Sequence, residues 1–459
     1  MKQRLVRLHH EAKRQHNQKR VHLQTFSSLS VLFGLLLFVP SLLPAETIAL
    51  TWDDAWQMAR TQNTEVLNSR EEVTIAKEQI NEARSGALPS LNLSGLYTRN
   101  LKSPVFFIDG QPIRIGLDND YQAKIELTQP IWVAGKVGSA LRIARSYLKQ
   151  SETTVTQTLQ DVRVQVAQTF YGVILAQELV KVTQTSLERA IQHRDQTRLM
   201  YEQGVVSEYD KIRAEVQVAN LEPPLLQAQN QYQLTKENLR RILKLDPLSD
   251  VDVIGTLELA DTTLPDANVE TAFERRPELT ALTHARKMQK ELVGFTRRDL
   301  YLPSIYAIAN YSASTQADNY EFDQYSWAKS AAAMVSVSIP LFDGFRTPAK
   351  VAQYRAELRR LDYTETDLRN GIRIDVENSR RELERALQTV RVQNDNVREA
   401  ERGYQIAKVR YENGMGTQLE LLDSELQLDN AKVNRLSALY SAKIARIQLE
   451  RAVGNPLNN

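Results

Sequence analysis

Two copies of one short motif, Tyr-Glu-Gln-Gly at residues 201–204 and Tyr-Glu-Asn-Gly at residues 411–414, lie 210 residues apart. Two proline-containing segments, Gln-Pro-Ile-Trp at 129–132 and Ile-Pro-Leu-Phe at 339–342, have the same separation. The proline therefore precedes the tyrosine by 71 residues in both halves of the chain. This constant spacing indicates a tandem duplication with one unit in each half, and the period is too long for a solenoid repeat.

The residues before each Tyr-x-x-Gly motif repeat with a period of seven, at Val173, Val180, Leu187, Arg194 and Tyr201 in the first half and at Leu383, Val390, Val397, Tyr404 and Tyr411 in the second. A second seam, in which small residues are common, follows three positions later, a pattern typical of left-handed coiled coils with closely spaced backbones. We expect a helix over 141–203, whose 63 residues would span about 95 Å.

Heptad spacing resumes after each motif, so each unit is predicted to contain a long antiparallel helical hairpin. The motif glycine, Gly204 or Gly414, is expected to end the first helix in the left-handed conformation. The first return helix, over 205–243, should bend at Pro223 and Pro224. A shorter helix, over 52–84 or 269–300, precedes each hairpin and is expected to stack end to end with the return helix.

Between Leu-Pro-Ser at 88–90 and the proline segment at 129–132, and again between 302–304 and 339–342, apolar and polar residues alternate with a period of two. Four strands of about 8 to 13 residues are predicted, two in each unit, joined by polar loops that contain Asp109-Gly110 and Asp318-Asn319. One strand face is apolar and is expected to contact lipid through Tyr121, Ile125, Leu127, Val335 and Val337. Two soluble hairpins packed on the helices are the alternative interpretation. Because small closed barrels begin at eight strands and open edges cannot stand in hydrocarbon, a membrane wall requires two or three copies, of which three leave a useful lumen.

The composition sets limits on the class of protein. The chain has 459 residues, 42% of them hydrophobic and 25% charged, and contains no Cys. A disordered chain is excluded, as are disulfides, thiolate metal sites and a lipid-modified N-terminal cysteine. Residues 1–45 hold seven Lys or Arg against one acid, and without them the net charge falls from +2 to −4, because 51 basic residues face 55 acidic ones. A nucleic-acid partner is therefore not indicated.

Residues 1–45 have the pattern of an export signal. A basic stretch ends at Arg20, an apolar run covers 29–39, and Pro40 interrupts it before Ala45. We expect cleavage near Ala45, and an uncleaved anchor is the alternative.

Side chains capable of catalysis are scarce. Once the export signal is removed, only His193 and His284 remain among the histidines. They lie on separate predicted helices, and both are expected to be solvated on a helix face rather than to bind a metal. The segment 134–139 lacks the upstream glycine of a phosphate-binding loop. We therefore expect no catalytic residue, no cofactor, no metal site and no enzymatic activity.

The combination of export signal, duplicated unit, Leu-Pro-Ser at 88–90 and 302–304, Pro-Leu-Phe-Asp-Gly-Phe-Arg at 340–346 and paired Tyr-x-x-Gly turns resembles the TolC-type outer membrane efflux proteins. The resemblance covers about 50–454 and, without a cysteine, points to the non-lipidated members. It implies a mainly α fold with a small β part: a homotrimer whose 12-stranded transmembrane β-barrel continues as an α-helical tunnel in the periplasm. It also implies export of solutes together with a periplasmic adaptor and an inner-membrane transporter.

The expected organisation is a signal peptide at 1–45, repeats at 46–246 and 268–459 with tips at 201–207 and 411–417, and a linker at 247–267. The exposed tips are predicted to dock the adaptor through Gly204, Val205, Val206, Gly414 and Met415. The resemblance further implies an acidic pore constriction at Glu420 and Asp423 and a tip latch between Tyr411 and Asp210. Gly416 stands where the family has a latch arginine. A periplasmic adaptor and a structural coiled-coil protein are the rival classes, although adaptors usually carry one such hairpin between β-rich halves.

Overall fold

The computed structural model describes residues 47–102, 105–114, 116–247, 249–259, 261 and 263–455. The predicted export signal at 1–45 lies outside these residues. Contacts divide the chain into two compact parts, which do not coincide with the two units of the duplication. The smaller part includes Thr47, Ile48 and residues 249–252. The architecture described below belongs to the larger part, except for one short strand pair.

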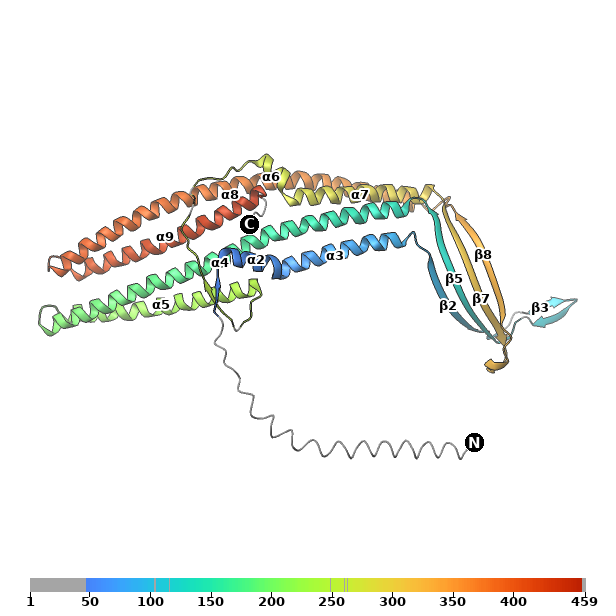
Figure 1. The fold of residues 1–459 in the computed structure, drawn as a ribbon, viewed down its shortest axis with the longest axis horizontal. Helices are drawn as coiled ribbons and strands as arrows, with labels where there is room; N and C mark the ends of the chain where they lie inside the picture. The colour runs from blue at the N-terminus through green and yellow to red at the C-terminus, as the bar shows by residue number, and fades with distance from the viewer. Residues whose placement is uncertain are drawn as a thin grey trace, which may run out of the picture. The chain divides into compact units, whose positions relative to one another are not determined.

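Two long helical hairpins of equal dimensions fill the two halves of the chain (Figure 1). Helices α4 (Lys136–Glu202) and α8 (Arg346–Glu412) have 67 residues each, and the return helices α5 (Glu208–Leu243) and α9 (Gln418–Val453) have 36 each. Helix α4 thus begins five residues before the expected start at residue 141. The predicted hairpins are confirmed.

Each hairpin turns at its Tyr-x-x-Gly motif. Gly204 and Gly414 have φ of 73° and 69°, the left-handed conformation that only glycine adopts without strain. The next amide, of Val205 or Met415, donates to a carbonyl of the preceding turn at 2.9 Å or 2.8 Å. This bond satisfies a carbonyl that the helix end would otherwise leave unpaired. Helix α5 runs through Pro223 and Pro224 without interruption, and the predicted bend there stays a prediction.

The two shorter helices, expected over 52–84 and 269–300, are each divided into two, and the sequence pattern did not predict this division. The first consists of α2 (Trp52–Gln62) and α3 (Thr64–Ser85), and the second of α6 (Val269–Arg275) and α7 (Pro277–Tyr301). The expectation of single helices over 52–84 and 269–300 was therefore wrong.

The breaks fall at Asn63 and Arg276, beside the ends of the return helices. Asn63 accepts a bond from the Glu65 amide at 2.9 Å and donates its side-chain amide to the carbonyl of Ile242, near the end of α5, at 3.2 Å. Arg276 donates to the carbonyl of Ala452, near the end of α9, at 3.2 Å. A helix carbonyl without an intrahelical partner needs such a donor. Each break therefore places a side chain over the end of the return helix of its own unit.

The helices pack as a wall in the order α3, α4, α7, α8, with consecutive helices in contact. Helix α4 also contacts α2, α5 and α9, so it lies at the centre of the packing. The largest buried side chains gather along α4 and the two return helices, among them Phe170, Ile174, Leu239 and Leu449. Burial of such side chains contributes roughly 1.5 to 3 kcal/mol each.

The four predicted strands form one antiparallel sheet in the order β2, β5, β7, β8. Their bounds are β2 Ser90–Arg99, β5 Asn119–Val133, β7 Ser304–Ala317 and β8 Ala328–Ser338. The two units of the duplication meet in the pairing of β5 with β7, which shifts register between Pro130 and Trp132. Among the described residues, no strand pairs with the outer sides of β2 and β8.

Two further pieces of β structure were not predicted. Strands β3 (Val105–Ile108) and β4 (Gln111–Arg114) form a hairpin where a polar loop was expected. Asp109 and Gly110 have φ of 50° and 78°, as a tight hairpin turn requires. Strand β1 (Thr47–Leu50) pairs with β6 (Asp250–Val253). A 3-10 turn, Phe322–Gln324, lies between β7 and β8.

Within the described ranges, no helix combines the length and the apolar character that crossing a membrane requires.

Candidate functional site

The sheet has one apolar and one polar face, and the strand register identifies them. Ile125 pairs with Leu93 on one side and with Tyr311 on the other, and Leu127 pairs with Leu91 and Ala309. Because side chains alternate along a strand, these residues share a face. The register places Tyr121, Val335 and Val337 on the same face.

Side chains on this apolar face are widely exposed in the single chain: Ile125 is 44% exposed and Val335 is 71% exposed. The Tyr121 ring stacks on Tyr97 with the centroids 4.9 Å apart. That these residues contact lipid stays a prediction.

The opposite face of the sheet is polar. Lys124 pairs with Ser94 and Ser312, and Glu126 pairs with Asn92 and Asn310. Lys124 and Glu126 also form an ion pair with each other along the strand. This face is suited to contact with water.

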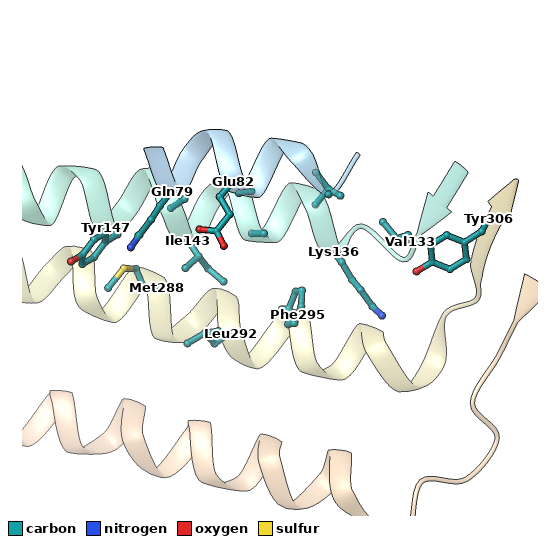
Figure 2. Close-up of a pocket in the computed structure, with 15 residues that line it drawn as sticks. Gln79, Glu82, Val133, Lys136, Ile143, Tyr147, Met288, Leu292, Phe295 and Tyr306 are labelled. Carbon is teal, nitrogen blue, oxygen red and sulfur yellow. The ribbon is translucent and has the colours of Figure 1, made fainter. Parts of the chain in front are cut away.

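A groove of about 730 Å³ opens among α3, α4 and α7 where the helical wall meets the sheet (Figure 2). Ile143, Met288, Leu292 and Phe295 give it an apolar lining, and Tyr147 on its edge donates a hydrogen bond to Glu72 of α3. We call it the apolar groove.

The sheet register shows which face of the wall carries the apolar groove. Tyr306 of β7 reaches its sheet end (Figure 2). It lies four and six residues before Asn310 and Ser312, the partners of Glu126 and Lys124. An even spacing along a strand keeps side chains on one face. The apolar groove is therefore continuous with the polar face of the sheet.

At the hairpin tips, the two predicted latch residues take part in different contacts. The Asp210 carboxylate accepts the Ser207 hydroxyl at 2.7 Å and closes a capping box at the start of α5. The Tyr411 ring packs edge-on against His193, with the centroids 5.3 Å apart. In the described part of a single chain, no hydrogen bond joins Tyr411 to Asp210, and their latch role stays a prediction.

Gln418 connects the two hairpins near these residues. Its side-chain nitrogen lies 3.1 Å from Nε2 of His193 and donates to the backbone carbonyl of Asp210 at 3.3 Å. Since an amide nitrogen can only donate, His193 accepts at Nε2 and carries its proton on Nδ1. No pattern in the sequence indicates a role for Gln418.

His193 is only 8% exposed, so its predicted solvation was wrong. Burial lowers the pKa of His193 because it disfavours the charged imidazolium. Its position had a signal in the sequence: it lies one turn from Ala190 and from Thr197, both of which belong to the seam of small residues. His284 of α7 is half-buried and lines a groove between α4 and α7.

A second polar cluster joins the hairpins farther from the tips. Arg189 of α4 forms an ion pair with Asp429 of α9, and its guanidinium lies 5.7 Å from the ring centre of Tyr404 on α8. Burial raises the pKa of the neighbouring Glu425. No sequence pattern had singled out this cluster, because its members come from three helices.

The predicted constriction and docking residues lie at exposed positions, with the exception of Val206. Glu420 and Asp423 are three residues apart on the first turns of α9, so they share a helix face, and Glu420 lies 3.7 Å from Arg410. Val205 is 68% and Met415 66% exposed, next to the two tip glycines, whereas Val206 is half-buried. The structure thus gathers the predicted docking side chains at the two turns.

Across the described ranges, no three His, Asp or Glu side chains gather as a metal site would require.

Comparison with known proteins gives a consistent result. A family model described as outer membrane efflux protein matches residues 55–243 and 268–455. The chain is 24% identical over 442 residues to the outer membrane protein TolC of Escherichia coli (strain K12), a match that covers 93% of this chain and 86% of that protein. It is 23% identical over 336 residues to the cobalt-zinc-cadmium resistance protein CzcC of Cupriavidus metallidurans, a match that covers 72% of this chain and 76% of that protein.

Among solved structures, the outer membrane protein VceC of Vibrio cholerae has a similar fold. The TM-score is 0.71 at 17% sequence identity, and the match covers 88% of this chain and 96% of that chain.

Proposed function

This chain belongs to the outer membrane efflux protein family, and on that premise we propose that three copies form one continuous channel from the outer membrane into the periplasm. As a family member it is an efflux channel of the outer membrane with a periplasmic helical part. The rival classes, a periplasmic adaptor and a structural coiled-coil protein, disagree with this membership.

The open edges of the sheet support the trimer most directly. Strands β2 and β8 have no partner on their outer sides among the described residues, and a barrel in lipid tolerates no unpaired edge. Three copies supply twelve strands, with the face of Ile125 toward lipid and the face of Lys124 toward the lumen. The test is electrophoresis with and without heating, followed by conductance in planar bilayers. A trimer band that disappears on heating and stable channels are expected, and a monomer without channels would contradict the proposal.

The hairpin tips supply the contact with a periplasmic adaptor, which in turn connects to an inner-membrane transporter. The exposed side chains of Val205 and Met415 support this role, since unpaired apolar surface at a protein tip is typical of an interaction site. Replacing Val205, Val206 and Met415 with Asp should abolish efflux while the trimer persists.

The matched control replaces Leu101, Val105 and Phe107 with Asp. These side chains are also exposed but lie in the connection between β2 and β5, at the end of the sheet that is far from the helices. This control should keep its efflux. Retained efflux in the tip variant would contradict docking at the tips.

Acidic side chains near the tips make the channel prefer cations. In a trimer, Glu420 and Asp423 would supply six carboxylates to one water-filled constriction, which attracts cations and repels anions. Glu420→Gln combined with Asp423→Asn should lower cation selectivity and block by multivalent cations in single-channel recordings. Asp395→Asn with Glu399→Gln removes the same charge from exposed positions of α8 and should change neither. Equal selectivity in wild type and in the tip variant would assign Glu420 and Asp423 to an ordinary solvated surface.

A further inference from the structure

A second groove, of about 350 Å³, lies between α4 and α7 and is lined mainly by basic side chains. Helix α4 contributes Arg142, Arg145 and Lys149, and helix α7 contributes His284, Lys287 and Lys290. The single acid in the lining, Glu291, lies 3.0 Å from Arg142. We call this the cationic groove.

Four of these cations have no ion-pair partner within the described ranges: Arg145, Lys149, Lys287 and Lys290. Elsewhere on the helices, charges are paired at short spacing, as for Arg402 with Glu399 on α8. Like charges that outnumber the nearby acids, here Glu291 and Glu152, repel one another and raise the local positive potential. The groove therefore has the charge of a site for an anion.

The pKa of His284 reports the same environment. Burial lowers the pKa of His284 most, the positive charges of Lys287 and Lys149 lower it further, and the carboxylate of Glu152 opposes them more weakly. His284 accordingly favours its neutral form, and its Nδ1 is buried without a hydrogen-bond partner among the described residues. The positive potential of the groove thus comes from the lysines and arginines.

The cationic groove lies on the face of the wall opposite to the apolar groove. Arg145 and Lys149 each follow a residue of the apolar groove, Ile143 and Tyr147, by two positions. At 3.6 residues per turn, two positions correspond to about 200° around the helix. Since the apolar groove is continuous with the lumen face of the sheet, the cationic groove faces outward.

Its height along the wall matches the membrane surface. Residues 142–149 lie about 9 to 20 Å along the axis from Lys136, the first residue of α4. The lipid-exposed sheet ends just above, where Trp132 is 50% exposed. The headgroup layer adds about 5 to 8 Å beyond the hydrocarbon, and an exposed charge acts over about 8 Å at physiological ionic strength. The groove is therefore within electrostatic range of the headgroups of the inner leaflet.

We propose that the cationic groove binds the phosphate headgroups of anionic lipids in the periplasmic leaflet of the outer membrane. This inference rests on the proposed trimer, which defines the outward face of the wall. Lipid phosphates at this height would offset the repulsion among four unpaired cations. Contact of this kind would fix how deeply the channel sits in the bilayer.

The test uses the intact trimer in nanodiscs of equal parts phosphatidylglycerol and phosphatidylethanolamine, with retained lipids counted by native mass spectrometry. One variant neutralises the groove with Arg145→Gln, Lys149→Gln, Lys287→Gln and Lys290→Gln. It should lower the ratio of retained phosphatidylglycerol to retained phosphatidylethanolamine at least about tenfold, because each Lys or Arg near a membrane surface adds to the attraction of anionic lipid. The milder Lys149→Gln with Lys287→Gln should give part of this loss if the full variant assembles poorly.

The matched control removes four charges from exposed sites of α8, with Arg385→Gln, Arg398→Gln, Arg402→Gln and Lys408→Gln, and should retain the wild-type ratio. An unchanged ratio in the groove variants, or an equal loss in the control, would overturn the proposal. Displacement of phosphatidylglycerol by equimolar inorganic phosphate would also overturn it, because the site would then bind free anions. A trimer without lipid preference would refute this inference alone, whereas loss of the trimer would refute the proposed function.

Discussion

The two hairpins have identical lengths but differ in how they are stabilised. Helix α4 has buried residues along most of its length, from Ser139 to Thr197, whereas those of α8 end at Val390. Helix α8 instead carries a series of ion pairs at spacings of three or four, which join Arg360 to Glu357, Arg369 to Glu365, Arg380 to Glu377 and Glu384, Arg385 to Glu382, Arg398 to Asp395, Arg402 to Glu399, and Lys408 to Glu412.

The difference follows from position in the wall. Helix α4 contacts helices on both sides, whereas α8 ends the order α3, α4, α7, α8. Exposed apolar residues remain on α8, among them Ile374 and Ile406, at 60% and 62%. Duplication thus preserved the length and the turn of the hairpin, while the side chains diverged between α4, which is central in the single chain, and α8, which is the last helix of its wall.

The largest expected effect is on the free energy of unfolding and concerns the two helix breaks. The break in the first unit has a neutral amide, that of Asn63, where the break in the second has a charged guanidinium, that of Arg276. Arg276 is 6% exposed and lies 3.0 Å from Glu278 and 2.8 Å from Asp375. Arg276→Ala removes the cation beside the half-buried Glu278, while the more exposed Asp375 keeps Arg451 at 4.0 Å, and the change should cost about 3 kcal/mol. Asn63→Ala removes one cap and one hydrogen bond, for about 1 to 2 kcal/mol.

Urea unfolding of the purified protein, followed by circular dichroism, measures both changes. Arg275→Ala serves as the control, because that side chain is exposed. Equal losses of unfolding free energy in Asn63→Ala and Arg276→Ala would mean that the buried charge of Arg276 adds nothing to stability beyond a helix cap.

The next effect tests whether the two units contribute equivalent strands. Ile125→Arg in the first unit and Val335→Arg in the second should each impair trimer assembly, because a lipid-facing Arg costs about 2 to 4 kcal/mol at the bilayer midplane. Lys124→Ala, on the opposite face, should assemble normally. The yield of heat-sensitive trimer in the membrane fraction is the measurement. Equal yields from Ile125→Arg and Lys124→Ala would reverse the assignment of faces.

A smaller effect concerns the contact between the hairpins at His193. The folded pKa of His193 lies below the ordinary value of 6.5, so the unfolded or separated state binds the proton more readily. The contact with Gln418 and Tyr411 is therefore fully stable above pH 6.5 and weakens as the pH falls below it.

The backbone carbonyl of Asp210, also bonded to Gln418, should be released at the same time. Single-channel recordings should accordingly find more frequent openings in mild acid, and His193→Asn should remove this dependence. A wild-type channel with the same opening frequency on both sides of that pH would speak against the contact.

The smallest effect concerns the ion pairs of α8. Arg398→Ala and Arg402→Ala each break one exposed pair, and such pairs contribute about 0.3 to 0.5 kcal/mol. The melting temperature of the trimer should fall slightly at low ionic strength and should not differ from wild type at high salt. A large loss that persists in salt would indicate that these residues pack against a neighbouring copy.

Sequence periodicity predicted the parts of the fold that repeat along one element. The hairpins, the left-handed Gly204 and Gly414, and the four strands follow from local spacing and turn chemistry. The division of the short helices did not, because the side-chain amide of Asn63 has its acceptor 179 residues away. Pro277 at the start of α7 was the one local signal for the second break.

The contacts at the candidate sites were harder to predict, since they join different helices. His193 meets Gln418 across 225 residues of chain, and the cationic groove gathers residues from α4 and α7 that are ordinary surface positions when each helix is considered separately. The spacing within one helix says which residues share a face, but not what that face meets.

The pairing of β5 with β7 joins the last strand of the first unit to the first strand of the second. In the proposed trimer, β8 of one copy would join β2 of the next, which is again a last strand meeting a first strand. The channel is then a six-unit ring in which every second junction is made within a covalent chain. A junction inside one chain forms at a high effective concentration and does not depend on the abundance of the protein. Dilution in the membrane can therefore limit only three of the six closures.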